Sequence, residues 1–239
     1  QRISSINSVA ALCEATGADV REVARAIGTD SRIGPKFLNA GPGFGGSCFQ
    51  KDILNLVYLC RHFGLPEVAD YWESVVALNT WQQHRIARLV VEKLFGTVTG
   101  KRLAVLGFAF KADTNDTREA PAIRICRDLL EEGAQLAIHD PKVAAEQMAR
   151  DLQQEAAPQA DALSGTGSWA QASSVESAVK GADAVLVLTE WQQYRELDWM
   201  SLASRMRKPA WVFDARAVTD PDQVRSAGLT LWRVGDGEG

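Results

Sequence analysis

Apolar residues recur every three or four positions through the first 97 residues, which is the spacing of amphipathic helices. The pattern predicts helices over residues 1–14, 19–28, 48–63 and 66–95. The second should begin with a capping box, because Asp19 is followed three residues later by Glu22. The last helix is long for a globular protein. It is expected to bridge two domains or to form a dimer seam, with an ordinary core helix as the alternative.

From residue 98 onward the pattern changes to short apolar runs separated by helical stretches. Strands are predicted at 102–107, 135–139, 184–189, 210–213 and 229–234, with helices around 117–132, 142–153, 174–180 and 192–206. Alternating strands and helices indicate a parallel sheet that is covered on both faces. Residues 154–172 are expected to form a surface loop or a weak edge element. The predicted fold class is therefore α/β: an all-helical region (1–97) followed by a Rossmann-like, doubly wound parallel-sheet domain (98–239).

The composition is that of an ordinary globular protein. The chain has 239 residues, 46% of them hydrophobic, and a net charge of −4 from 26 basic and 30 acidic residues. A mildly acidic balance argues against a nucleic-acid partner, and no apolar run is long enough to predict a membrane span. The four cysteines form no C-x-x-C pair, which argues against a structural zinc site and favours a reduced, cytoplasmic protein.

Residues 41–46 (GPGFGG) match the glycine pattern of dinucleotide-binding folds, but their context does not. That fingerprint requires a buried strand before it and a second strand after its helix. Residues 32–40 contain a glycine and a proline, and Pro66 lies where the second strand should be. We therefore reject a dinucleotide site at this position.

The other candidate nucleotide site follows the predicted strand 102–107. It has the strand, turn, helix and second strand of a Rossmann unit and ends at Asp140, but it keeps only the first glycine of the fingerprint. Ligands of such folds bind at the carboxyl ends of the strands. Lys111 and Arg118 are expected there, as phosphate contacts or as solvated loop charges.

Cys48 follows the glycine loop at the start of a predicted helix. The partial positive charge of a helix N-terminus favours a thiolate, and Lys51 adds a cation. Asp52 lies one turn further on the same face, where it could orient a water or relay a proton. The arrangement fits an activated nucleophile, with a buried, inert cysteine as the alternative. The other cysteines, Cys13, Cys60 and Cys126, are expected in the core.

These segments carry a family resemblance. Residues 43–52 (GFGGSCFQKD) closely resemble the nucleophile segment of the UDP-glucose 6-dehydrogenase family, whose wider group also oxidises GDP-mannose and UDP-N-acetyl sugars. Residues 107–111 (GFAFK) and 113–119 (DTNDTRE) look like two further segments. The resemblance continues through QRISSIN at 1–7, DP at 140–141, TEW at 189–191 and FDAR at 213–216, and so covers nearly the whole chain.

The resemblance implies three parts in the whole enzyme: an N-terminal NAD domain, a central helical dimerisation region and a C-terminal UDP-binding domain. This chain would supply the last two. An NAD domain, with a catalytic Lys, Asn and Glu, would then precede Gln1, and the isolated chain would be inactive. The start at Gln1 rather than Met agrees with this expectation. A processed or tagged terminus is the alternative.

The resemblance also implies a reaction and its residues. The C6 alcohol of UDP-glucose would become an acid in two oxidations with NAD, through a thiohemiacetal and a thioester on Cys48, and Asp52 would help water to hydrolyse the thioester. Arg32 would reach the sugar nucleotide of a neighbouring subunit in a homodimer or higher oligomer. Substrate contacts would come from Phe37, Leu38, Asn39, Gly43, Phe44, Gly45, Phe110, Lys111 and Arg216, and NAD contacts from Cys48, Lys51 and Arg118.

Two positions depart from the family pattern. Asn39 stands where animal-type members carry Lys, and Ala215 replaces a glycine. Two alternatives remain: a sister dehydrogenase acting on another nucleotide sugar, and a non-catalytic, nucleotide-sugar-binding dimerisation module.

Overall fold

The computed structural model describes residues 1–157 and 166–237. Its first part contains α1 (Arg2–Thr16), α2 (Val20–Gly28), α3 (Phe49–His62) and α4 (Pro66–Lys93), close to the predicted ranges. The predicted capping box of α2 is wrong. Asp19 instead caps the helix through the backbone N–H of Arg21, at 2.8 Å, and both of its carboxylate oxygens also bind the Arg21 guanidinium. The carboxylate thus accepts from the second N–H of the helix rather than from that of Glu22, the third.

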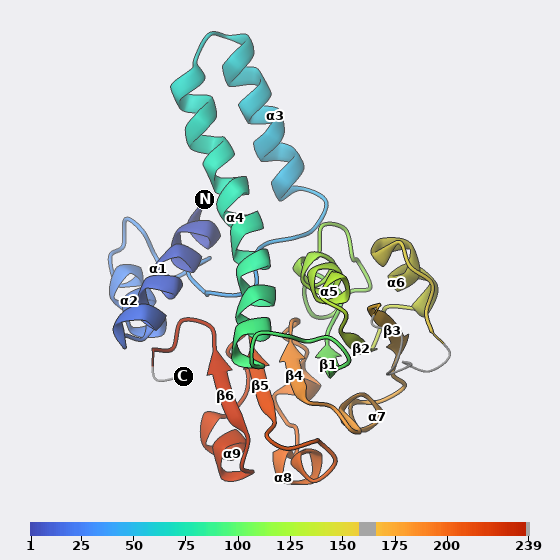
Figure 1. Ribbon diagram of the computed structural model, residues 1–239. Coiled ribbons are helices and arrows are strands. Elements are labelled where there is room, and N and C mark those ends of the chain that lie inside the picture. The colour runs from blue at the N-terminus through green and yellow to red at the C-terminus, as the bar shows by residue number, and fades with distance from the viewer. Residues whose placement is uncertain (158–165, 238–239) are drawn as a thin grey trace.

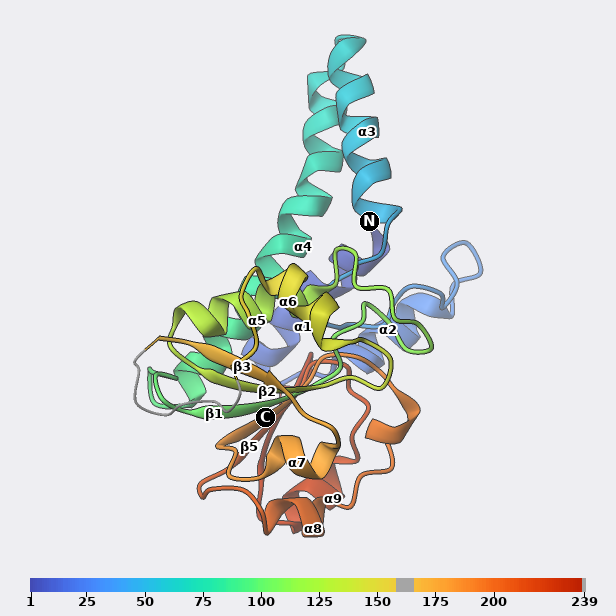
Figure 2. The ribbon, with the colours of Figure 1, turned by 90° about the vertical axis from the view of Figure 1, so that its right-hand side faces the viewer.

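The helices α3 and α4 form an antiparallel hairpin that projects from the rest of the molecule (Figures 1 and 2). A small core of Val57, Cys60 and Ala69 holds the hairpin together. The second half of α4 returns to the body, where Ile86 and Val90 are buried in the main core with the strands. The helix thus joins the hairpin to the sheet.

The sheet has six parallel strands in the order β3-β2-β1-β4-β5-β6. Their bounds are β1 (Arg102–Leu106), β2 (Gln135–His139), β3 (Ser168–Gln171), β4 (Ala184–Val187), β5 (Trp211–Asp214) and β6 (Thr230–Arg233). The edge strand β3 lies in the stretch expected to be a loop or weak edge element; part of that stretch, 158–165, falls outside the described residues. The strand has no continuous apolar run, and only Trp169 is fully buried.

Helices cover both faces of the sheet (Figure 2). One face carries α5 (Pro121–Glu131), α6 (Ala145–Leu152) and the end of α4, and the other carries α7 (Val175–Val179), α8 (Trp199–Ala203) and α9 (Pro221–Ser226). The predicted Rossmann-like α/β fold is confirmed. The helix predicted over 192–206 is instead a 3₁₀ turn, η1 (Gln192–Tyr194), followed by α8, because Asp198 caps a new helix by accepting from Ser201 N–H.

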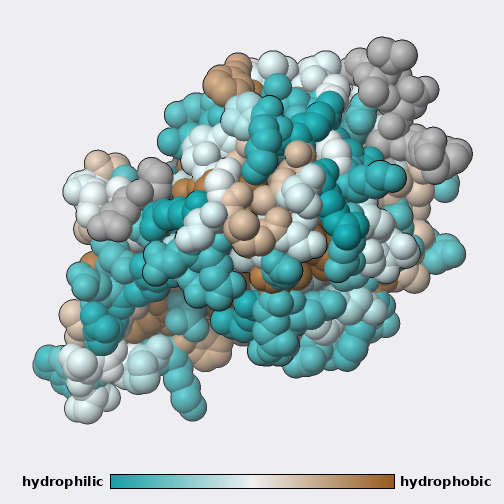
Figure 3. Space-filling view, turned by 90° about the horizontal axis from the view of Figure 1, so that it is seen from below, coloured by the Kyte–Doolittle hydropathy of each residue, from teal (hydrophilic) through white to brown (hydrophobic). Residues whose placement is uncertain are grey.

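The strand order reverses between β1 and β4, and ligands of such sheets bind at the carboxyl ends beside this reversal. In Figure 1 the strand arrowheads point toward α1 and α4, so this edge faces the helical part of the chain. The opposite side of the molecule is mostly hydrophilic (Figure 3). Among the described residues, no helix is long and apolar enough to cross a bilayer.

Candidate active site

A cavity of about 630 Å³ lies at the carboxyl edge of the sheet, between the loop before α3 and the loops after β1, β4 and β5. It brings together most of the predicted substrate residues. Its lining includes Phe37, Asn39, Gly43, Phe44, Gly45, Phe110, Lys111 and Arg216, with Phe49 and Glu190 in addition. Such a volume is typical of small-ligand sites.

Arg216 forms the polar wall of this cavity. Only 16% of its side chain is exposed, and its Nε and Nη2 donate to the carbonyls of Leu188 (2.9 Å) and Phe110 (3.0 Å). Glu190 lies 3.0 Å from Nε as an ion partner. Burial lowers the pKa of the guanidinium, while the charges of Glu190 and Asp214 oppose this shift. The guanidinium is therefore a fixed cation that is held by two different loops.

Asp214, at the end of β5, sets the loop that carries Arg216. Its carboxylate is buried and accepts from the backbone N–H of Arg216 (3.0 Å) and from the N–H (2.8 Å) and hydroxyl (2.7 Å) of Thr219. Burial raises the pKa of this carboxyl, and the hydrogen bonds from Thr219 and Arg216 oppose the rise.

Three buried amide side chains on α1 and α4 hold the glycine loop, and the sequence analysis missed them. Asn7 accepts from Gly41 N–H at 2.9 Å, and Gln82 donates to Gly41 O at 2.9 Å. Asn79 makes two hydrogen bonds with the backbone of Phe44, at 2.8 and 3.1 Å. Polar side chains on the buried face of a helix were the available signal.

The glycine loop also contacts the loop that follows β1. Gly46 N–H donates to Arg118 O at 2.7 Å. A Cβ added at Gly45 would lie only 2.4 Å from Glu119 O, so a residue without a side chain is required there. The two loops that bear the predicted substrate residues are thus in direct contact.

Cys48 is the N-cap residue of α3 and is exposed, unlike Cys13, Cys60 and Cys126, which are buried as predicted. Its Sγ lies 3.5 Å from the hydroxyl of Ser47. Exposure argues against the alternative of a buried, inert cysteine.

The surroundings of Cys48 contain charged groups. Asp52 lies one turn along α3, where its N–H donates to Cys48 O, and both Asp52 and Lys51 are exposed. The guanidinium of Arg118 is also exposed and pairs with Asp116 at 2.7 Å. The pKa of Arg118 is raised, chiefly by this hydrogen bond and in smaller part by Cys48.

Phe49 lines the cavity, whereas Cys48, which precedes it in the chain, is not among the lining residues. The ring of Phe49 meets those of Phe44 and Phe37 edge-on, with centroids 5.9 and 6.4 Å away. All three rings line the cavity, and Phe49 directly follows Cys48 in the chain. The backbone of Cys48 is therefore adjacent to a residue of the cavity wall.

Arg32 and Leu38 are the predicted substrate residues outside this lining. Arg32 lies on the loop after α2, which stands away from the body in Figure 2; its side chain is 86% exposed and pairs with Asp30. Leu38 is buried and lines a second cavity. The structure does not bring Arg32 to the cavity of its own chain.

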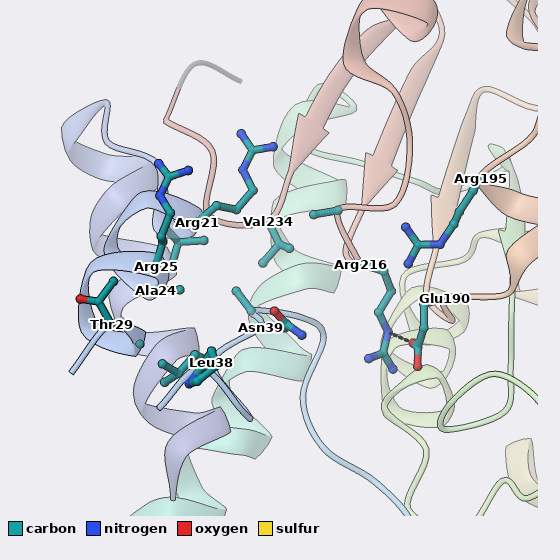
Figure 4. A pocket seen from close by; sticks show the side chains of 15 residues that line it. Arg21, Ala24, Arg25, Thr29, Leu38, Asn39, Glu190, Arg195, Arg216 and Val234 are labelled. Carbon is teal, nitrogen blue, oxygen red and sulfur yellow. Dashed lines mark ion pairs between the residues drawn. The ribbon is translucent and has the colours of Figure 1, made fainter. Parts of the chain in front are cut away.

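The second cavity, of about 690 Å³, is drawn in Figure 4. It shares Pro35, Asn39, Glu190 and Arg216 with the first. Arg195 reaches toward the ion pair of Arg216 and Glu190, which the dashed line marks in Figure 4. Arg21 and Arg25 lie on the α2 side and pair with nearby carboxylates. The two cavities are therefore adjacent.

The sheet does not fit a dinucleotide at its first loop. Phe108, Ala109 and Phe110 follow Gly107 in place of the glycines that would admit a pyrophosphate, and the Asp140 carboxylate is engaged by protein donors. Among the described residues, no group of three or more His, Cys, Asp and Glu side chains is arranged to hold a metal ion.

Comparison with known proteins assigns the helical hairpin, with its cysteine-bearing glycine loop, and the parallel sheet to a class of nucleotide-sugar dehydrogenases. Residues 1–81 match the central domain of the UDP-glucose/GDP-mannose dehydrogenase family, and residues 104–221 match its UDP-binding domain. The chain belongs to this family.

Relatives agree with the family match. UDP-glucose 6-dehydrogenase 2 of Oryza sativa subsp. japonica is 51% identical, and UDP-glucose 6-dehydrogenase 1 of Arabidopsis thaliana 50% identical, each over 98% of this chain and 50% of the relative. A UDP-glucose dehydrogenase structure from Pyrobaculum islandicum matches 98% of this chain and 48% of that one, with a TM-score of 0.77 and 29% identity. The chain thus spans about half the length of the curated relatives it matches.

Proposed function

We propose that this chain forms the substrate-binding, nucleophile-bearing half of an NAD-dependent UDP-glucose 6-dehydrogenase, which converts UDP-glucose to UDP-glucuronate. One observation carries the proposal. Phe110, Lys111, Arg216 and the glycine loop line a single cavity, whose lining also includes Phe49, the residue directly after Cys48. Arg216 and Lys111 supply cations for a diphosphate, and Phe37, Phe44 and Phe49 supply an apolar wall.

Cys48 is proposed as the covalent nucleophile. Its thiolate would add to the C6 aldehyde, so that an S–C bond forms and the carbonyl oxygen takes a proton, giving a thiohemiacetal. Oxidation of this adduct would leave a thioester, and water would hydrolyse it to the acid and free Cys48. Asp52, one turn along α3, is the proposed group that orients this water. Covalent attachment would keep the reactive aldehyde bound between the two oxidations.

The oxidations require a hydride acceptor, and this is the chemistry that NAD supplies when it is bound. The first loop of the sheet does not fit a dinucleotide, as described above. Lys51, Arg118 and Cys48 are exposed around the start of α3, where they could meet the cofactor from outside this sheet. We therefore propose that they contact NAD carried by another part of the enzyme, and that the 239-residue chain alone does not turn over substrate.

A homodimer or higher oligomer is also part of the proposal. The projecting hairpin exposes Tyr58, Phe63, Leu65 and Tyr71, and an apolar surface of this kind is typical of a protein contact. Arg32, which is exposed and does not line the cavity of its own chain, is then available to a neighbouring subunit. A cytoplasmic location is supported by the four free cysteines.

Calorimetric titration of the chain tests the substrate, using UDP-glucose, UDP-N-acetylmannosamine and GDP-mannose. Tightest binding of UDP-glucose is expected. Tighter binding of another nucleotide sugar would favour a sister dehydrogenase. The specific reason to test this alternative is Asn39, which departs from the family pattern and lines both cavities. An NADH assay with UDP-glucose and NAD tests the rest, and turnover by this chain alone would contradict the proposed division of labour.

A further inference from the structure

Asp140 immediately follows β2 and is only 6% exposed. Its carboxylate accepts hydrogen bonds from five protein donors. One oxygen accepts from the backbone N–H of Phe108 (2.7 Å) and Ala109 (3.0 Å) and from the indole N–H of Trp191 (3.2 Å). The other accepts from the backbone N–H of Lys142 (2.9 Å) and Val143 (3.1 Å).

In a dinucleotide-binding Rossmann sheet, an acidic residue at the end of the second strand binds the ribose hydroxyls of the cofactor. Asp140 has this place in the sheet, but its oxygens are directed to protein donors. A buried carboxylate that is satisfied mainly by backbone amides fixes the segments that supply them. The residue therefore has a different task in this sheet.

The donors lie next to the substrate cavity. Phe108 and Ala109 directly precede Phe110 and Lys111, which line that cavity. Trp191 directly follows Glu190, the ion partner of Arg216. One carboxylate thus joins the loop after β1, the loop after β2 and the loop after β4.

We propose that Asp140 is a positioning residue for binding of the UDP-sugar diphosphate, which it serves by holding Phe110, Lys111 and the Glu190–Arg216 pair in register. This inference rests on the proposed function of the cavity. An asparagine would keep the shape of the side chain but replace one acceptor oxygen by an NH₂ group that faces N–H donors. The loops would then lose their common anchor.

The experiment is calorimetric titration of the full chain with UDP. Asp140→Asn is expected to raise the Kd of UDP by about tenfold, or about 1.4 kcal/mol. The matched control is Asp183→Asn. Asp183 also accepts from a backbone amide of the sheet, Arg102 N–H at 2.8 Å, but at the amino end of β1. This control should leave the Kd unchanged even if it lowers the melting temperature.

A double-mutant cycle separates positioning from general loss of stability. Lys111→Met removes the cation that Asp140 is proposed to position, so the effects of Asp140→Asn and Lys111→Met on UDP binding should be less than additive. If Asp140→Asn does not fold, Trp191→Phe removes a single donor and should still raise the Kd, by about threefold.

Each outcome bears on a different claim. An unchanged Kd in Asp140→Asn, or in Trp191→Phe if that variant must be used, would overturn the positioning role alone, as would full additivity with Lys111→Met or an equal rise in Asp183→Asn. Failure of the unsubstituted chain to bind UDP would overturn the proposed function, and this inference with it.

Discussion

Asn79, in the middle of α4, binds both backbone groups of Phe44: its Oδ1 accepts from Phe44 N–H at 2.8 Å and its Nδ2 donates to Phe44 O at 3.1 Å. A side chain of the long helix thereby satisfies both backbone groups of a residue in the loop that leads to Cys48, as a neighbouring strand would in a sheet. The side chain is 2% exposed, so water does not compete for these bonds. The conformation of this loop is therefore stabilised by α4.

Replacing Asn79 by Ala should therefore lower the free energy of unfolding by about 3 kcal/mol, because it leaves two buried backbone groups without partners. Urea denaturation measures this change. Asn55→Ala, at an exposed position on α3, is the matched control and should change stability by less than about 0.5 kcal/mol. Equal effects of the two substitutions would show that the hydrogen bonds between Asn79 and Phe44 add no stability.

Because of His139, the free energy of unfolding should decrease at pH values below about 6.5. His139 is buried against Tyr194, with Nδ1 2.9 Å from the phenol oxygen, and burial lowers its pKa below the ordinary value of 6.5 although Asp140 and Glu176 oppose the shift. The unfolded chain then binds a proton more readily than the folded chain as the pH drops from 6.5 toward the folded-state pKa. Stability is lost in that window, with a slope of at most about 1.4 kcal/mol per pH unit.

Urea midpoints between pH 7.5 and 5 measure this dependence. His139→Gln should flatten it, whereas His62→Gln, at an exposed histidine of α3, should leave it as it is. The same slope in wild type and His139→Gln would assign the effect to other groups.

The apolar surface of the hairpin predicts self-association. Replacing Tyr58, Phe63 and Tyr71 together by Ser should shift the chain from an oligomer to a monomer, because each is more than half exposed on the hairpin. Sedimentation equilibrium gives the mass directly. Phe95→Ser, at a 77% exposed aromatic outside the hairpin, should leave the association intact. If the unsubstituted chain is a monomer, the proposed subunit interface on the hairpin is contradicted.

Iodoacetamide should label the native chain at one cysteine. Cys48 is exposed, while Cys13, Cys60 and Cys126 are buried. Burial also raises the pKa of Cys13 and of Cys126, which disfavours their reactive thiolates. Mass spectrometry should find a single adduct that persists in Cys60→Ser and disappears in Cys48→Ser. Labelling of Cys48→Ser at the wild-type rate would show that another thiol reacts.

The sequence predicted the strands that are continuous apolar runs, because burial on both faces leaves few polar positions. It gave only a weak indication of β3, whose burial depends on one residue, Trp169. It also missed the break before α8, which depends on the cap by Asp198 rather than on hydrophobic periodicity. The local hydrophobic pattern was sufficient to predict an element only where the element is marked by its own run of apolar residues.

The same limit holds at the site. Gly43–Gly45, Phe110 and Lys111 lie in contiguous motifs, and the structure gathers them with Arg216 around one cavity. The hydrogen bonds from buried amide side chains to the glycine loop were not predicted, because the partners are distant in sequence. Asn7 and Gly41 are separated by 34 positions, and Asn79 and Phe44 by 35. The roles of the motif residues in binding and catalysis stay predictions.

Protection of Cys48 by substrate tests the central claim most directly, because it joins the cavity to the nucleophile. The rate of Cys48 alkylation should fall by about tenfold when UDP-glucose is present at ten times its Kd. Glucose at the same concentration should have no effect, and Arg216→Met should abolish the protection at the wild-type UDP-glucose concentration. An alkylation rate that UDP-glucose leaves unchanged would contradict a sugar-nucleotide site beside a catalytic Cys48.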